Sequence, residues 1–442
     1  MAKKIDPTIV HPEYPNLERR YDICEDAFLG EVCEYVPKLV NQSDKEYQIY
    51  ISRAAYFNMV EKTVTAVCGA LTRKPYVLSG YETFPGTEDG NGTTFIQESY
   101  RDLLLGARVA MLVDVNSTGQ SYIINYDADD IINWFGNGTQ PGDYVVIKEC
   151  ALVQDSENPF EQVEVESWRE LHIDENGNYG VRIWTQTNSA EYVSETLPPF
   201  LVNGQPIKYI PLWVATPFDN SWDVYSPPLH SQASLNLQHF RQATDLAHYA
   251  HFMALPTFTI IGDLAVYTDS LGNQTTSPIK MGSTQEALHL MPGSMAQYTE
   301  VSGASFAMLQ TEMAATEERM YIAGSRLLSS KNGVESATAL QLRSGSETAS
   351  LDTMCHSLQS ALNAAIALCG EIDHVPNAGI QLNKDFTAAV TDPASIKALL
   401  DLYIAQTITL DQLLAELYLG EVVKPVVNIA ETVPNNDIAP SQ

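Results

Sequence analysis

The chain has 442 residues, of which 45% are hydrophobic, and this length is enough for two or three domains with cores of their own. Its 55 Asp and Glu residues outnumber its 25 Lys and Arg residues, which gives a formal net charge of -30. This charge disfavours a surface that wraps nucleic acid by neutralising phosphates, so any contact with DNA should be loose.

The six cysteines are scattered along the chain without paired spacing. The sequence therefore predicts neither a zinc site nor a disulfide framework, and we expect reduced thiols. The start of the chain lacks the apolar core of a signal peptide, and no run approaches the roughly 20 apolar residues that a membrane helix needs. We expect a soluble protein with no membrane partner.

The first 45 residues are rich in proline, charge and tyrosine, and they predict an N-terminal arm laid over the body or over a neighbour. This arm holds one short helix, over Leu17–Leu29. From Glu46 onwards, apolar residues at helical spacing predict one long amphipathic helix, which Pro75 ends. Its apolar positions are Tyr47, Tyr50, Ala54, Phe57, Val64, Val67 and Leu71.

Between Tyr76 and Thr216 the pattern changes to short β-type runs, which Gly, Asn and Pro clusters separate. This pattern predicts a mostly antiparallel sheet with one helix packed on it, over about Thr94–Leu105, so the fold class is α+β. The expected strands are Val109–Val115, Tyr122–Tyr126, Tyr144–Val153, Val163–Ile173, Tyr179–Gln186 and Ile207–Val214.

After Pro227 and Pro228 the chain turns helical, with an alanine-rich row that allows another helix to approach closely until Pro256 ends it. Short strands follow, including Thr257–Gly262 and Ala287–Met291, and then a second helix that Gly324 is expected to stop. The residues expected to pack these two helices, or neighbouring subunits, together are Ala243, Ala247, Ala250, Ala254, Leu309 and Met313.

A third helical stretch runs from about Ala337 to Cys369 and could span about 50 Å. Two shorter helices follow. One is capped by Asp392 with Pro393 in its first turn, and the other is capped by Thr409 with Gln412 three residues later. The last twenty residues predict a flexible tail.

Motifs that carry nucleotide or hydrolytic chemistry are missing. The sequence has no GxxxxGK[ST] phosphate loop, no Gly-rich dinucleotide turn, no H-E-x-x-H and no G-x-S-x-G elbow. This disfavours a nucleotide-driven motor. We predict no catalytic residue and no cofactor.

Three weaker constellations could hold a metal, and each has a more economical structural interpretation. Asp174, Asn176 and Asn178 have calcium-loop spacing but favour a hairpin turn, because the expected glycine and glutamate are absent. Asp127, Asp129 and Asp130 could hold magnesium, although no phosphate loop accompanies them. Three residues on one helix, Asp245, His248 and His251, lack an obvious fourth ligand, so a polar helix lining or a subunit contact is favoured.

The order of these elements resembles the portal, or head-to-tail connector, proteins of tailed bacteriophages. Short stretches carry the resemblance: Arg53–Asn58 followed by Arg73, Lys74 and Pro75; Pro227–Leu229 with Leu235, Asn236 and Leu237; and Ala337–Ala339, which open the long helix. The resemblance implies a structural ring subunit at one vertex of the capsid, present in the host cytoplasm only during assembly.

The resemblance also implies a division of the chain into named parts. The N-terminal arm (1–45) has no clear counterpart. The other parts are an α+β wing (46–226), a stem of two helices (227–255 and 303–323) with a small β-containing clip between them (256–302), a tunnel loop (324–336), a long wing helix with its return (337–389), a helical crown (390–420) and a tail (421–442).

Portal subunits form a ring of twelve through which double-stranded DNA enters and leaves without sequence specificity. The resemblance implies docking of the terminase motor, of major capsid or scaffold proteins and of a tail adaptor. Twelve stem helices spaced by about 10 Å would leave a bore of roughly 28 Å. The candidates to touch DNA are the tunnel-loop residues Arg326, Ser329, Ser330, Lys331 and Asn332, because this loop carries two cations in an acidic chain. A plain solvated loop is the alternative for this segment.

Two alternatives stay open. Another virion structural protein, such as a tail adaptor, would also be acidic, oligomeric and without catalytic motifs. A hydrolase that uses Asp127, Asp129 and Asp130 would instead depend on a metal and lose activity when Asp129 is replaced by asparagine.

Overall fold

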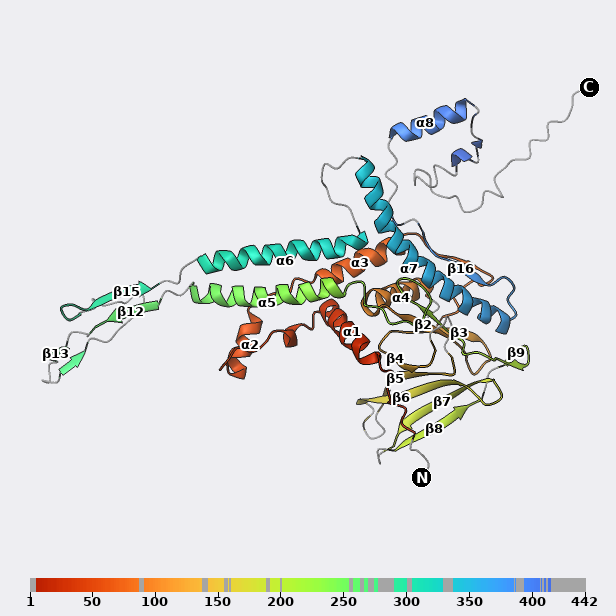
Figure 1. Cartoon of the computed structure of the whole chain (residues 1–442), viewed down its shortest axis with the longest axis horizontal. Coiled ribbons are helices and arrows are strands. Elements are labelled where there is room, and N and C mark those ends of the chain that lie inside the picture. The colour runs from red at the N-terminus through yellow and green to blue at the C-terminus, as the bar shows by residue number, and fades with distance from the viewer. Residues whose placement is uncertain are drawn as a thin grey trace, which may run out of the picture.

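The computed structural model describes residues 5–86, 91–136, 142–154, 158, 160–187, 191–198, 201–253, 257–262, 266–268, 274–276, 290–299, 304–328, 337–384, 386, 393–405, 407, 409–410 and 412–414. Figure 1 shows a mixed helix-and-sheet body, with a hairpin of two long helices extending from it. These helices are α5 (His230–Met253) and α6 (Ala304–Leu328).

Two antiparallel sheets form the β part of the body. The first has the strand order β11-β2-β3, and the second has the order β4-β5-β6-β7-β8. The strands are β2 (Val109–Val115), β3 (Ser121–Tyr126), β4 (Ile131–Trp134), β5 (Tyr144–Gln154), β6 (Gln162–Ile173), β7 (Tyr179–Gln186), β8 (Tyr192–Leu197) and β11 (Leu212–Ala215). Strands expected at five of these positions, β2, β3, β5, β6 and β7, are confirmed to within a residue or so at each end.

Four short strand pairs complete the described β structure, and all are antiparallel. They are β1 (Val77–Ser79) with β16 (Gly379–Gln381), β9 (Leu201–Val202) with β10 (Gln205–Pro206), β12 (Thr257–Ile261) with β15 (Met295–Thr299), and β13 (Val266–Thr268) with β14 (Gln274–Thr276). The pairing of β1 with β16 joins segments 300 residues apart, which no local sequence pattern could predict.

The body also contains helices that pack on the sheets or on one another. They are α1 (Tyr14–Leu29), the 3-10 turn η1 (Cys33–Tyr35), α2 (Asp44–Ser52), α3 (Met59–Leu71), α4 (Gly92–Gly106) and α7 (Ala337–Ile372), with α8 (Pro393–Ile404) further along the chain. Both α4 and α7 contact β2. Every residue of Val109–Val113 is buried, so β2 is covered on both faces. Each large apolar side chain buried there contributes about 1.5–3 kcal/mol.

The prediction of a single long helix from Glu46 is wrong, because the chain forms α2 and α3 with a break at 53–58. Asn58 ends the break, since its side-chain oxygen accepts from the N–H of Glu61 (2.9 Å) and so caps α3. Its amide also donates to the carbonyl of Phe28 (2.7 Å). Apolar spacing ran through the break because Ala54 and Phe57 happen to keep the helical period.

The N-terminal helix is part of the body. Leu17, Tyr21, Cys24 and Ala27 of α1 all lie in the main hydrophobic core. Of the two positions considered for the arm, the described part occupies the one over the body.

Two element ends also differ from the expectation. Helix α6 continues through Gly324 to Leu328, so the predicted stop at this glycine is wrong. The expected strand Ile207–Val214 is confirmed only from Leu212, where it continues to Ala215. Strand Ala287–Met291 was expected on residues that lie largely outside the described part of the chain.

Candidate functional site: the helical hairpin of α5 and α6

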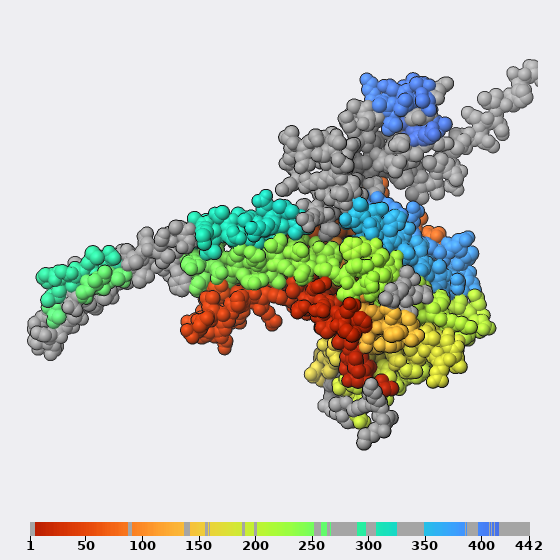
Figure 2. All heavy atoms as spheres, in the orientation of Figure 1, coloured from red at the N-terminus to blue at the C-terminus, as the bar shows by residue number. Residues whose placement is uncertain are grey.

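Within the described part of the chain, the α5–α6 hairpin is the feature that extends furthest from the body. Pro227 and Pro228 precede it, and the carbonyl of Pro227 accepts from the N–H of His230 (3.1 Å) as α5 begins. The two helices lie side by side along their length and reach well beyond the body, as the green and teal surfaces in Figure 2 show. At 1.5 Å per residue, the 24 residues of α5 span about 36 Å.

Buried polar side chains join the body end of the α5–α6 hairpin, called its root below, to α3. The amide of Gln232 donates to the hydroxyl of Thr63 (2.9 Å), and both residues are buried. Asn236 is fully buried, accepts from the N–H of Met59 (2.9 Å) and donates to the carbonyl of Phe57 (2.9 Å). These bonds satisfy backbone groups at the break between α2 and α3. The position of the hairpin root and the conformation of this break therefore depend on each other.

Gly324 permits the close approach of α6 at this root. A Cβ atom there would lie 2.4 Å from the amide nitrogen of Gln232 and 3.0 Å from the hydroxyl oxygen of Thr63. Glycine at position 324 is therefore required for the close packing of α6 on Gln232 and Thr63, and it does not end α6.

Further along the hairpin, the seam between α5 and α6 combines apolar and polar contacts. His239 is buried on α5, and its Nε2 atom lies 3.1 Å from a carboxylate oxygen of Glu317 on α6. Thr244 and Thr316 are also buried, and each hydroxyl donates to the carbonyl four residues earlier in its own helix. The partners of His239 Nε2 and of both threonine hydroxyls reduce the cost of placing these polar groups in a helix seam.

The Asp245 and His248 pair joins α5 to α2. Tyr50 donates to the carboxylate of Asp245 (2.5 Å), and a guanidinium nitrogen of Arg53 lies 2.9 Å from Nδ1 of His248. The rings of Tyr50 and His248 meet edge to face, with centroids 5.1 Å apart. This arrangement supports the expected polar contact, although it lies within one chain.

The structure places the predicted packing residues along the hairpin. Ala243, Ala247, Leu309 and Met313 are half-buried, Ala250 is exposed, and Ala254 lies outside the described residues. Of the predicted DNA-contacting residues, Arg326 belongs to the last turn of α6. The other four, Ser329, Ser330, Lys331 and Asn332, lie outside the described part.

Strands β12 and β15 follow the free end of the hairpin as a two-stranded ribbon (Figure 1). Ile261 and Met295 pair directly and are both about half exposed. The strand residues of β12, β13, β14 and β15 include no charged side chain, which is unusual in a chain of charge -30. A ribbon of two strands is marginally stable alone, so it benefits from a partner that packs on it.

The other two acidic constellations form turns. The carboxylate of Asp174 accepts from the N–H groups of Asn176 and Asn178 (2.8 Å each), and Gly177 has a φ of 78°, as the expected hairpin turn requires. These hydrogen bonds, foremost that from Asn178, lower the pKa of Asp174.

The turn of Asp127, Asp129 and Asp130 anchors α1. Tyr21 donates to Asp127 (2.9 Å), Tyr14 donates to Asp129 (2.9 Å), and Asp127 also accepts from the N–H groups of Asp129 and Asp130. Burial and the neighbouring Asp127 raise the pKa of Asp130 to about 7. The three carboxylates thus serve hydrogen bonds within the chain.

No described group of three His, Cys, Asp or Glu side chains has the arrangement that a metal ion needs. All six cysteines are described, and all are free thiols. Within the described ranges, no helix has the length and apolar character that a membrane crossing requires.

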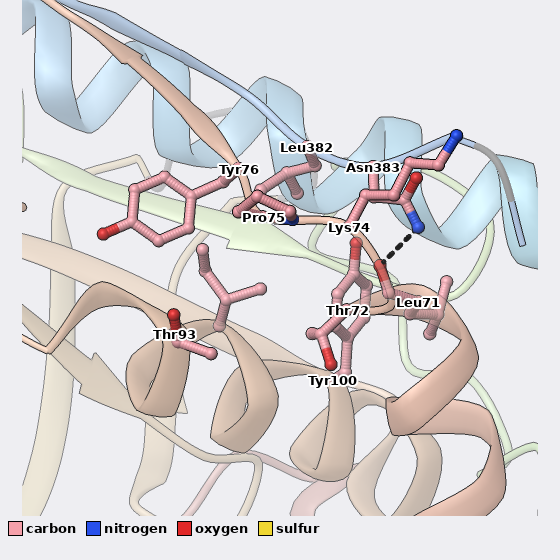
Figure 3. A pocket seen from close by; sticks show the side chains of 10 residues that line it. Leu71, Thr72, Lys74, Pro75, Tyr76, Thr93, Tyr100, Leu382 and Asn383 are labelled. Atoms are coloured by element: carbon pink, nitrogen blue, oxygen red, sulfur yellow. Dashed lines mark hydrogen bonds between the residues drawn. The ribbon is translucent and has the colours of Figure 1, made fainter. Parts of the chain in front are cut away.

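Two pockets lie in the body, away from the hairpin. A cavity of about 20 Å³ lies between the end of α3 and the segment at Leu382, as Figure 3 shows. It has room for about one water molecule. The amide of Asn383 closes it by donating to the carbonyls of Ala70 and Leu71 (3.3 Å each). A pocket of about 440 Å³ beside Tyr81 contains Asp373, whose carboxylate accepts from Tyr81 and Ser121.

Sequence reasoning missed the residues that hold the hairpin root: Thr63, Gln232 and Asn236. The sequence marks these three positions only as polar residues that interrupt otherwise apolar helical rows, which does not identify their partners. Asn236 was noted for its resemblance to a family stretch, but its bonds to Phe57 and Met59 depend on a chain separation of more than 170 residues.

Comparisons with known proteins give one family and several solved structures. A family described as "Domain of unknown function (DUF4055)" matches residues 228–371, which contain α5, α6 and nearly all of α7. No curated protein matches the chain.

Three solved structures resemble most of the chain at low identity. A chain of the "Virion of native gene transfer agent (GTA) particle" is 11% identical over 86% of this chain and 94% of that chain, with a TM-score of 0.41. A chain of the "Neck of empty GTA particle computed with C6 symmetry" is 12% identical over 88% and 97%, with a TM-score of 0.43. A chain of the "Neck of native GTA particle computed with C12 symmetry" is 11% identical over 90% and 99%, with a TM-score of 0.42. These neighbours belong to a virion and to its neck, and at such TM-scores they carry no argument about the activity of the present chain.

Proposed function

We propose that this chain is a portal-type ring subunit, which surrounds a channel for double-stranded DNA at one vertex of a virion. In this role it is a structural protein without catalytic activity. The terminase motor, capsid or scaffold proteins and a tail adaptor are its proposed partners.

The observation that carries the proposal is the α5–α6 hairpin. Its helices extend from the body, and the uncharged ribbon of β12 and β15 follows their free end. Apolar side chains on its outer surface face water in a single chain: Tyr249 is 44% exposed, Met308 is 70% exposed and Tyr321 is 54% exposed. Exposed apolar groups along an extended element favour contact with further subunits.

A ring of twelve would leave room for a DNA channel. Twelve hairpins, each contributing one inner helix at about 10 Å spacing, form a circle about 38 Å across and leave a bore of roughly 28 Å. A DNA duplex fits through this width. The net charge of -30 per chain repels phosphates, which supports sliding over tight binding.

Electron microscopy of the purified protein, with the mass measured in parallel, tests the proposal. We expect rings of about a dozen subunits with an open centre, because twelve inner helices at about 10 Å spacing leave a bore of roughly 28 Å. A monodisperse monomer or trimer, also in the presence of scaffold and terminase, would overturn the proposal and favour a tail adaptor.

A substitution on the hairpin tests whether its outer surface joins subunits. Met308→Glu places a charge at an exposed position, so the melting temperature of the single chain should change little while ring formation falls. Rings that form as readily as in the wild type would exclude the surface at Met308 from the subunit contacts.

The segment between α6 and α7 is the proposed DNA contact. Deleting Lys331–Gly333 should leave ring assembly intact and impair the retention of packaged DNA, because a cation that contacts the backbone is lost. Particle counts and protected DNA per particle measure the two effects separately. Normal DNA retention in this variant would contradict the assignment of Lys331 and Asn332.

A further inference from the structure

Arg108 is a fully buried cation in the body, immediately before β2. Its side chain is 1% exposed, and its Nη2 atom donates to the carbonyls of Trp222 (2.8 Å) and Asp223 (3.3 Å). The guanidinium lies 4.4 Å from the ring centroid of Trp134 and 5.6 Å from that of Trp222. One side chain thus joins β2, β4 and the segment that leads into α5.

The hydrogen bonding around Arg108 is incomplete. Within the described part of the chain, neither Nε nor Nη1 of Arg108 has an acceptor, and the same holds for the indole Nε1 of Trp222. Trp222 is also 1% exposed. Buried N–H donors without an acceptor are costly and rare, so three on two adjoining residues indicate a ligand.

The charge of Arg108 is also uncompensated by direct contact. Burial lowers its pKa to about 10, which still leaves the guanidinium protonated at neutral pH. Glu13 and Asp223 attract it electrostatically, but neither carboxylate accepts a hydrogen bond from it. A buried cation is stable only when a negative charge or several acceptors lie close to it.

The N-terminal segment closes the site from outside. The ring of His11 stacks on Trp134 with centroids 3.9 Å apart and an interplanar angle of 17°. The N–H of His11 donates to the carbonyl of Ile132 (2.8 Å), and Asn133 donates to the carbonyl of Ile9 (2.7 Å). Because Arg108 and Trp222 are each 1% exposed, a side chain of another protein or a nucleic-acid phosphate has no direct access to them.

We propose that Nε and Nη1 of Arg108 and Nε1 of Trp222 bind a small monovalent anion of the halide class, with chloride as the physiological ion. The anion accepts the three N–H groups and offsets the guanidinium charge. It thereby stabilises the junction of β2, β4 and the segment that leads into the hairpin. A water molecule would accept hydrogen bonds there but would leave the charge uncompensated.

Thermal unfolding of the full chain tests the proposal with bromide as the probe. The comparison is sodium bromide against sodium gluconate at equal ionic strength, since gluconate is too large for the site. Above the dissociation constant, the wild-type melting temperature should rise by about 2 °C for each tenfold increase in bromide. Equal melting temperatures in the two salts would overturn the proposal.

Matched variants separate this site from general salt effects. Arg108→Met keeps the aliphatic volume and removes the donors, so it should lose the difference between bromide and gluconate. Arg182→Met removes an arginine that pairs with Glu170 (2.8 Å) and is 38% exposed, and it should keep the difference. A bromide effect that survives in Arg108→Met would place the ion elsewhere and exclude this site.

A direct measurement covers the case in which Arg108→Met does not fold. Crystals of the wild-type protein grown in bromide should give an anomalous peak within hydrogen-bonding distance of Arg108 and Trp222. Water density at this position without an anomalous peak, or bromide only at exposed sites, would overturn the proposal.

Discussion

At the scale of single residues, Gly324 shows how one missing side chain positions a helix. Replacing it with alanine would force a Cβ atom against Gln232, which is 1% exposed and already bonded to Thr63. We expect Gly324→Ala to lower the free energy of unfolding by about 1–3 kcal/mol, because overpacking outweighs the gain of about 1 kcal/mol in helix propensity.

Gly69 in α3 is the matched control, since an added Cβ atom there meets nothing within 4 Å. Gly69→Ala should therefore be neutral or stabilising. Denaturant unfolding of both variants measures the difference. Equal effects at the two positions would show that Gly324 has no packing role.

A second prediction at this scale concerns pH and Asp130. Its folded pKa of about 7 lies above the ordinary value of 3.8, so the folded state keeps a proton that the unfolded state loses. The stability from this proton is complete below about pH 4 and is lost as the pH rises through about 7. Asp130→Asn should match the wild type below about pH 4 and become increasingly more stable than it as the pH rises, with a difference of more than about 1 kcal/mol near pH 8.

Asp174 provides the control of opposite sign. Its pKa is lowered by hydrogen bonds from the backbone, so Asp174→Asn should destabilise the protein near pH 8. Melting temperatures at the two pH values distinguish the variants. The same sign for both substitutions would contradict the assigned electrostatic cause.

At the scale of elements, the break between α2 and α3 depends on Asn58. Asn58→Ala removes a helix cap and the bond to Phe28 of α1, so we expect a loss of about 2 kcal/mol in unfolding free energy. Asn58→Asp keeps the capping oxygen and loses only the donated bond, so it should be roughly half as destabilising. If the two variants were equally unstable, the cap would contribute nothing.

This break also marks the limit of prediction from sequence. Strands such as β2 and β7 were predictable because turn residues bound short apolar runs, and α5 was predictable because prolines flank it. The split of α2 from α3 and the passage of α6 through Gly324 depend on Asn236 and Gln232, which lie far away in the chain. A local pattern records periodicity but not the partner that an amide will find after folding.

At the scale of the whole molecule, the order of elements was more predictable than any contact within them. The hairpin was expected from two helical rows around a β segment, and α5 and α6 confirm both rows. The residues that hold the root of the hairpin were not expected, because their bonds close loops of about 170 residues or more. The burial of Arg108 was equally unpredictable from sequence, because the residues around it come from four separate segments.

The last prediction follows from the charge of the proposed ring. Twelve copies of a -30 chain carry a formal charge of about -360, so repulsion between subunits opposes assembly. Salt screens exposed charges beyond about 10 Å at 0.1 M and beyond about 3 Å at 1 M, while apolar contacts such as that expected at Met308 are not weakened. The fraction of protein in rings should therefore rise between about 50 mM and about 500 mM sodium chloride. Mass photometry at both salt concentrations measures this fraction, with sodium gluconate as a second salt to separate screening from halide binding at Arg108. Rings that dissociate as salt is added would mean that ion pairs, and not apolar faces of the hairpin, hold neighbouring subunits together.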